Sequence, residues 1–199
     1  MTLSFAINWD YRCPFARIVH RHVVDGLLDG ADWNVTFVPF SLGQVHVDDG
    51  ELPIWERPDD DTGLLALQAA VVVRDSDPEL FPVVHRALFE ARHADGAQLR
   101  DEGVLRQILT AHGADADAVF AEVATGKPLD IVRDEHTASA TDLDVWGVPT
   151  FMVGGRAAFV RLMDLPVDAA DARRNIERVV EMLAGWQSLN EFKHTSLDR

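Results

Sequence analysis

The chain contains a single cysteine, Cys13, among its 199 residues. One cysteine excludes a disulfide within the chain, which suits a protein of a reducing compartment. The sequence also lacks the closely spaced sulfur, histidine and carboxylate ligands of a zinc site, because most of its histidines fall on separate predicted helices. We therefore expect no metal site, and any redox cycle of Cys13 has to use a second thiol from outside the chain.

Basic residues and long apolar runs are also scarce. The chain has 18 Lys and Arg against 33 Asp and Glu, a net charge of −15, whereas phosphate binding needs a basic surface. No segment approaches the roughly 20 apolar residues of a membrane span, and residues 1–9 lack the basic start and long apolar centre of a signal peptide. We therefore expect a cytoplasmic protein without a nucleic-acid or membrane partner. Its hydrophobic content of 47% is enough for one packed domain.

The first part of the chain has the pattern of a parallel strand, helix, strand unit. Residues 3–9 alternate between apolar and smaller or polar side chains, which is typical of a strand, and residues 15–28 repeat apolar residues at helical spacing. Residues 33–40 form a second predicted strand. Residues 41–61 contain Gly, Pro and three consecutive Asp, so they predict a long connection without secondary structure.

The second part of the chain predicts a helical insertion followed by a return to the sheet. Residues 62–126 show only helical spacing, in four short helices separated by glycines and caps. A further helix then leads to an apolar hairpin joined by Gly154-Gly155, and a last helix opens at Asp168. The predicted fold class is α/β. Its domains are residues 1–61 with 127–199, the α/β domain, and residues 62–126, the all-helical insertion.

Cys13 lies where the first predicted strand meets the first predicted helix. A helix N-terminus offers unpaired N–H groups and a partial positive charge, both of which favour a thiolate. Pro14 suits the first helical position, and Arg12 and Arg17 lie close in sequence. The pattern therefore predicts a nucleophilic Cys13 whose pKa is lowered. The alternative interpretation is a small buried side chain without chemistry.

Three motifs follow one another along the chain: Cys13-Pro14-Phe15 after Trp9-Asp10, then Gly147-Val148-Pro149-Thr150, then Phe151-Met152-Val153-Gly154-Gly155. In this order they resemble the thioredoxin fold of the disulfide-oxidoreductase A (DsbA) family over nearly the whole chain. Within that family the chain looks most like the actinobacterial branch that includes mycothiol-dependent reductases, through the same motifs and the terminal Glu191-Phe192-Lys193.

The resemblance implies a substrate groove between two of these motifs. Pro149 would follow a cis bond opposite Cys13 and expose the backbone of Val148 to an extended substrate or a small thiol. Cys13 would be the catalytic nucleophile. The expected substrate- or thiol-binding residues are Tyr11, Arg12, Pro14, Phe15, Trp146, Val148, Pro149 and Thr150.

Ala16 departs from the family pattern, because dithiol members have a second cysteine at this position. Without it the resemblance implies a monothiol route, with no tightly bound cofactor and with glutathione or mycothiol as the cosubstrate. The partners would be a small thiol or disulfide or a protein thiol, and a homodimer is left open. Two alternatives remain: a thiol-dependent transferase or isomerase similar to the kappa-class or 2-hydroxychromene-2-carboxylate isomerase enzymes, and a binding module that has lost its chemistry.

Overall fold

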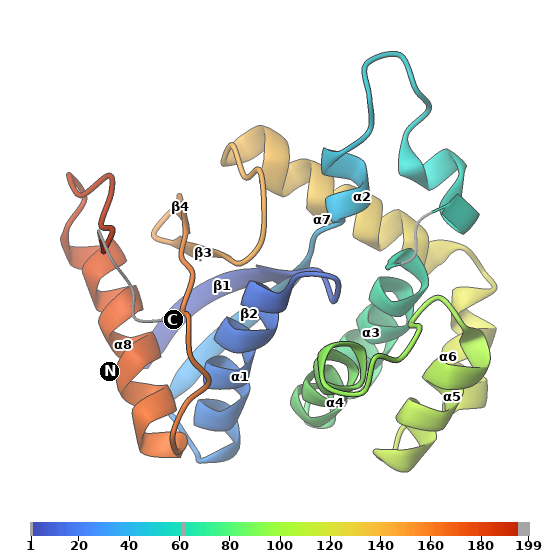
Figure 1. The fold of residues 1–199 in the computed structure, drawn as a ribbon, viewed down its shortest axis with the longest axis horizontal. Coiled ribbons are helices and arrows are strands. Elements are labelled where there is room, and N and C mark those ends of the chain that lie inside the picture. The colour runs from blue at the N-terminus through green and yellow to red at the C-terminus, as the bar shows by residue number, and fades with distance from the viewer. Residues whose placement is uncertain (1, 61–62, 195–199) are drawn as a thin grey trace.

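A four-stranded mixed sheet forms the centre of the protein in the computed structural model, which describes residues 2–60 and 63–194 (Figure 1). The strand order is β2-β1-β3-β4. β1 is parallel to β2 and antiparallel to β3, and β3 is antiparallel to β4. The strands are β1 Leu3–Trp9, β2 Trp33–Pro39, β3 Thr150–Val153 and β4 Arg156–Phe159.

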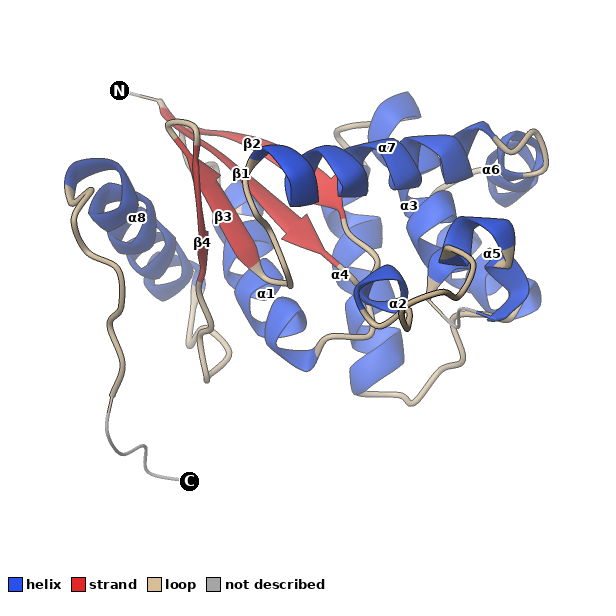
Figure 2. Ribbon diagram, turned by 90° about the horizontal axis from the view of Figure 1, so that it is seen from above, coloured by secondary structure: helices blue, strands red, loops and turns tan. Residues whose placement is uncertain are grey.

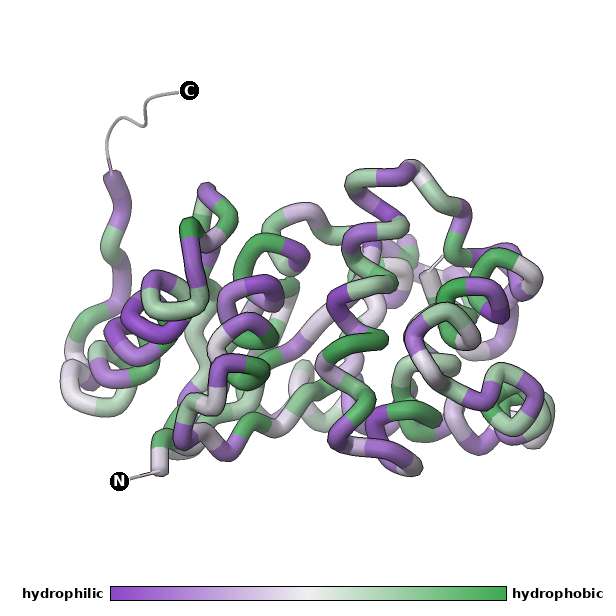
Figure 3. The backbone as a smooth tube through the Cα atoms, turned by 90° about the horizontal axis from the view of Figure 1, so that it is seen from below, coloured by the Kyte–Doolittle hydropathy of each residue, from purple (hydrophilic) through white to green (hydrophobic). Residues whose placement is uncertain are grey.

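Helices cover both faces of this sheet. α1 (Pro14–Leu28) and α8 (Ala169–Gly185) pack against each other on one face, and α7 (Lys127–Asp142) crosses the other face beside β2 (Figure 2). Along α8, hydrophobic residues recur every three to four positions between hydrophilic ones, which is the pattern of a helix with one buried side (Figure 3). Asp168 caps α8 by accepting a hydrogen bond from the Asp171 N–H at 2.7 Å, as the sequence predicted.

The inserted segment is helical, as expected, and shares its core with the sheet. The side chains of β1 lead into this core: Ile7 and Trp9 are fully buried, and Trp9 packs against Phe81 at a centroid distance of 5.8 Å. The domain boundaries themselves stay a prediction. The inserted helices are α3 Leu64–Ser76, α4 Phe81–His93, α5 Glu102–Ala111 and α6 Ala116–Val123.

The connection after β2 is more ordered than the sequence predicted. It contains a short helix, α2 (Leu42–Val45), and two 3₁₀ turns, Ile54–Glu56 and Pro58–Asp60. The prediction of a stretch without secondary structure was therefore wrong. Side-chain hydrogen bonds to the backbone stabilise these short elements. Ser41 caps α2, and the Gln44 side chain accepts from the Ile54 N–H at 3.0 Å.

Candidate active site

Cys13 is the N-cap residue of α1. Its backbone is extended, its Sγ accepts a hydrogen bond from the Ala16 N–H at 3.4 Å, and Pro14 occupies the first turn of the helix. The Cys13 N–H in turn donates to the Asp10 carbonyl at 3.1 Å, which closes a tight turn after β1. The sequence placed Cys13 at a helix start, and the structure agrees.

The loop before β3 faces Cys13. The peptide bond between Val148 and Pro149 is cis, and the Val148 carbonyl oxygen lies 3.4 Å from Cys13 Sγ, where it accepts the thiol hydrogen bond. Within the described residues the Val148 N–H has no hydrogen-bond acceptor. Two segments that are far apart in the sequence thus meet at one sulfur atom.

Asn8, the last residue but one of β1, holds this loop in position. Its side-chain amide donates to the Gly147 carbonyl at 3.0 Å, and its Oδ1 accepts from the Thr150 N–H at 2.6 Å. The Thr150 hydroxyl also donates to the Gly147 carbonyl, at 2.8 Å. Asn8 is fully buried, and sequence reasoning missed its role. An asparagine between the apolar Ile7 and Trp9 of a predicted strand was the available signal, since buried amides need partners.

Asp10 organises the turn on the other side of Cys13. Its fully buried carboxylate pairs with the Arg12 guanidinium at 2.8 Å and accepts from the Leu42 N–H at 2.8 Å. It therefore ties the cysteine turn to the connection after β2. The prediction that Arg12 stabilises a Cys13 thiolate is not supported, because Arg12 is committed to this ion pair, and Arg161 is the cation whose charge favours the thiolate.

The pKa of the Cys13 thiol is raised above its ordinary value, so the prediction of a lowered pKa was wrong. Burial is the main cause, since the residue is only 8% exposed and a buried thiolate loses hydration. The N–H groups of Ala16 and Phe15 oppose this effect, as does the charge of Arg161, while the Asp10 carboxylate adds to it. Desolvation outweighs the helix N-terminus here.

We therefore expect alkylation of native Cys13 by iodoacetamide to rise with pH along a curve whose midpoint lies above the ordinary value of 9.0. Only the thiolate reacts, and a raised pKa keeps the thiol protonated at neutral pH. The same chain unfolded in urea is the control, because its cysteine is solvated. A native midpoint below that of the unfolded chain would contradict the dominance of burial.

Tyr11 points into the interior rather than into the groove. It is 1% exposed, and its hydroxyl lies 2.7 Å from His85 Nδ1 in α4. His85 Nε2 lies 2.9 Å from His20 Nδ1, and His20 Nε2 lies 2.9 Å from the Asn8 carbonyl. A carbonyl only accepts, so His20 donates to Asn8, His85 donates to His20, and Tyr11 donates to His85. The chain of bonds joins the cysteine turn to β1 and α4.

Three of the predicted groove residues reach the surface. Pro14 is exposed, Phe15 is half-buried and Trp146 is 63% exposed. The Trp146 ring packs on Phe159 at a centroid distance of 4.6 Å. Arg161, which sequence reasoning missed, follows β4 and lies over the Phe15 ring at 4.8 Å. Val148, Pro149 and Thr150 are buried beneath this surface.

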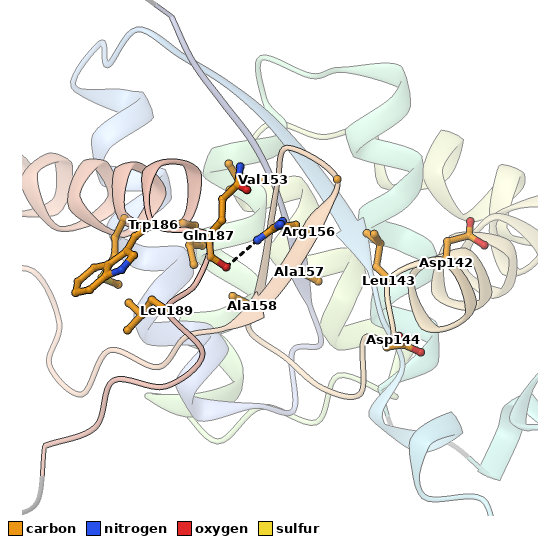
Figure 4. Close-up of a pocket in the computed structure, with 13 residues that line it drawn as sticks. Asp142, Leu143, Asp144, Val153, Arg156, Ala157, Ala158, Trp186, Gln187 and Leu189 are labelled. Carbon is orange, nitrogen blue, oxygen red and sulfur yellow. Dashed lines mark hydrogen bonds between the residues drawn. The ribbon is translucent and has the colours of Figure 1, made fainter.

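A separate pocket of about 410 Å³ lies between the end of α7, the β3–β4 hairpin and the end of α8 (Figure 4). Arg156 closes one side by donating to the Gln187 carbonyl at 2.8 Å. Asp142 and Asp144 line the opposite side. Neither Cys13 nor the Val148-Pro149 segment lines this pocket, so we do not assign it to the thiol site.

Residues 2–60 and 63–194 contain no group of three or more His, Cys, Asp or Glu side chains that could hold a metal ion. In the same residues, no helix is long and apolar enough to cross a membrane.

A sheet flanked by helices, with a cysteine at a helix start opposite a cis-proline, defines a protein of the thioredoxin-like class. A family model described as a DSBA-like thioredoxin domain matches residues 7–170. The chain therefore belongs to this family of thioredoxin-fold disulfide oxidoreductases, and its helices α3–α6 form the helical insertion of that fold. No curated protein matches the chain.

Solved structures agree on the fold. A probable DsbA oxidoreductase from Streptomyces coelicolor is 16% identical, with a TM-score of 0.61 over 96% of this chain and 93% of that one. The cytosolic disulfide reductase DsbM from Pseudomonas aeruginosa, solved with GSH, is 16% identical, with a TM-score of 0.61 over 90% and 100%. Reduced DsbA1 from Neisseria meningitidis is 15% identical, with a TM-score of 0.60 over 90% and 83%. The finer placement in a mycothiol-dependent branch stays a prediction.

Proposed function

We propose that the protein is a monothiol oxidoreductase that exchanges disulfides through Cys13 and uses a low-molecular-weight thiol to complete its cycle. The observation that carries the proposal is the position of Cys13 Sγ, 3.4 Å from the Val148 carbonyl and beside the cis-proline. A reducing compartment such as the cytoplasm suits this cycle, because it supplies the outside thiol.

In the first step, the Cys13 thiolate attacks one sulfur of a disulfide R–S–S–R. The Cys13–S–S–R mixed disulfide forms, and R–S⁻ leaves and takes a proton from solvent. The Ala16 N–H, 3.4 Å from Sγ, stabilises the negative charge on sulfur before attack. The Val148 N–H, which has no acceptor among residues 2–60 and 63–194, is a donor for the backbone of an extended substrate beside the sulfur.

In the second step, an outside thiol G–SH attacks the mixed disulfide as its thiolate. The Cys13 thiolate leaves, and R–S–S–G is released, so the net reaction converts R–S–S–R and G–SH into R–S–S–G and R–SH. Ala16 has no sulfur with which to replace this thiol, and Cys13 is the only cysteine of the chain. Glutathione and mycothiol are the two thiols that we consider.

The raised pKa of Cys13 favours a second candidate, a thiol-dependent transferase or isomerase. In that role Cys13 would stay protonated and donate its S–H to the sulfur of a bound cosubstrate thiolate, as it now donates to the Val148 carbonyl. No disulfide would form. A binding module without chemistry remains the outcome if neither activity is found.

Turnover of a peptide disulfide tests the first candidate. We expect reduction by the native protein when glutathione or mycothiol is added, little without a thiol, and no protein-dependent rate for Cys13→Ser under any condition. Serine keeps the size and the hydrogen-bonding capacity of the side chain but cannot form a disulfide. If native protein and Cys13→Ser give the same rates with each thiol, the oxidoreductase proposal fails and the transferase or binding candidates take its place.

A further inference from the structure

Arg161 is a cation beside Cys13 that forms no ion pair with any carboxylate among the described residues. The two arginines that flank Cys13 in the sequence are neutralised: Arg12 pairs with Asp10 at 2.8 Å, and Arg17 pairs with Glu90 at 2.6 Å. The positive charge of Arg161 is therefore available to a ligand of the thiol site.

Aromatic rings hold this cation without neutralising it. The Arg161 guanidinium carbon lies 4.8 Å from the centre of the Phe15 ring and 5.7 Å from that of Phe159. The Phe159 ring in turn packs on Trp146, at 4.6 Å. Cation–π contacts attract the positive charge but use up none of the N–H donors of the guanidinium as hydrogen bonds to carboxylates. A planar edge of N–H donors matches a carboxylate.

The place of the cation relative to the sulfur also fits a small ligand. Phe15 is two residues beyond Cys13 at the start of α1, and Trp146 is two residues before Val148. The charge of Arg161 acts on the Cys13 thiol, where it lowers the pKa against the effect of burial. The cation therefore lies within reach of a molecule whose sulfur meets Cys13.

We infer that Arg161, held over Phe15 and Phe159, forms a subsite for a carboxylate of the small thiol or disulfide that reacts at Cys13. This inference rests on the proposed function and narrows its substrate class. Thiols with a free carboxylate, of which glutathione is one, are preferred over thiols with an uncharged sugar, of which mycothiol is one.

Three small disulfides of similar length test the inference: the anionic dithiodipropionate, the neutral hydroxyethyl disulfide and the cationic cystamine. The rate of mixed-disulfide formation at Cys13 is followed by intact mass, and each rate is divided by that for the neutral probe. This ratio cancels the thiolate fraction of Cys13, which Arg161 also influences. For Arg161→Gln we expect the anionic ratio to fall about fivefold and the cationic ratio to rise, which is the upper range for an exposed pair.

Two further variants separate charge from geometry. Arg161→Lys keeps the charge and should retain part of the preference for the anion. Arg178→Gln removes the same charge from the exposed side of α8 and should leave all ratios unchanged. Added salt should lower the anionic-to-neutral rate ratio of the native protein, because Arg161 is exposed to solvent and its charge is screened.

The outcomes distinguish this inference from the proposed function. Unchanged ratios in Arg161→Gln, or an equal fall of all three rates, would overturn the subsite while leaving the exchange chemistry of Cys13 intact. An absence of mixed disulfide with every probe would overturn the proposed function itself, and the subsite with it.

Discussion

The protein should lose much of its stability between pH 6.5 and pH 4. Burial lowers the pKa of His20 from 6.5 to about 4 and that of His136 to about 4, and it also lowers the pKa of His85 well below its ordinary value. These histidines stay neutral in the fold but take up protons when the chain unfolds, so acid favours unfolding. A lowered pKa of this size corresponds to about 3 kcal/mol for each of His20 and His136.

The sign follows from the two pKa values of each histidine. Above pH 6.5 neither state is protonated, and the stability is fully present; it falls as the pH drops toward about 4. Urea midpoints measured between pH 7.5 and pH 5 would show this fall. His136→Gln should reduce the slope, because an amide oxygen can still accept from the Ser41 N–H but cannot titrate there.

The control is His112→Gln, which changes an exposed histidine at the end of α5 and should leave the slope unchanged. A urea midpoint that stays constant over this pH range would show that the histidines are not buried as neutral side chains.

Ala16→Cys should create a disulfide oxidase from a protein that lacks this activity on its own. The Ala16 N–H already contacts Cys13 Sγ at 3.4 Å, one helical turn along α1, so an introduced thiol lies within reach of the first sulfur. It could then resolve a mixed disulfide without an outside thiol. We expect the oxidised variant to convert a reduced dithiol peptide into its disulfide, one peptide per protein and without glutathione or mycothiol, at least about tenfold faster than the native protein.

Ala16→Ser is the matched control, because it adds a side chain of similar size that cannot form a disulfide. Ala16 is fully buried, so both variants strain the packing around α1 by a similar amount. Equal rates for the two variants would mean that the missing second sulfur is not what limits native turnover.

The elements around the site were predictable because their signals are local. Alternation in residues 3–9 gave β1, and the Cys13-Pro14 pair marked the start of α1 within one residue. Asp168 likewise marked the start of α8. Each of these signals involves residues a few positions apart, where hydrogen bonding and side-chain spacing leave a direct trace in the sequence.

Contacts between distant residues could not be predicted in the same way. Arg161 lies just after β4, which ends at Phe159, and its guanidinium contacts the Phe15 ring of α1, which is distant in the sequence. His20 and His85 belong to helices whose packing the sequence does not specify. Arg12 lies next to Cys13 in the sequence, yet its guanidinium turns back to Asp10.

The direction of the Cys13 pKa shift was missed for a similar reason. Position at a helix N-terminus is visible in the sequence and favours the thiolate. The burial that outweighs it arises from tertiary packing, in which Cys13 Sγ also contacts the Val148 carbonyl, and only the folded chain reveals it.

The most direct measurement of whether Cys13 is a catalytic thiol is its rate of reaction with glutathione disulfide and with mycothiol disulfide, followed by intact mass. Each rate is divided by the fraction of Cys13 that is thiolate at the assay pH, which the alkylation midpoints give. The corrected rate of the native protein is then compared with that of the urea-unfolded chain. We expect the native thiolate to react faster, to gain a single thiol on Cys13, and to lose it again when free thiol is added. A native thiolate that reacts more slowly than the unfolded one, or an adduct that free thiol does not release, would show that Cys13 is only a buried side chain.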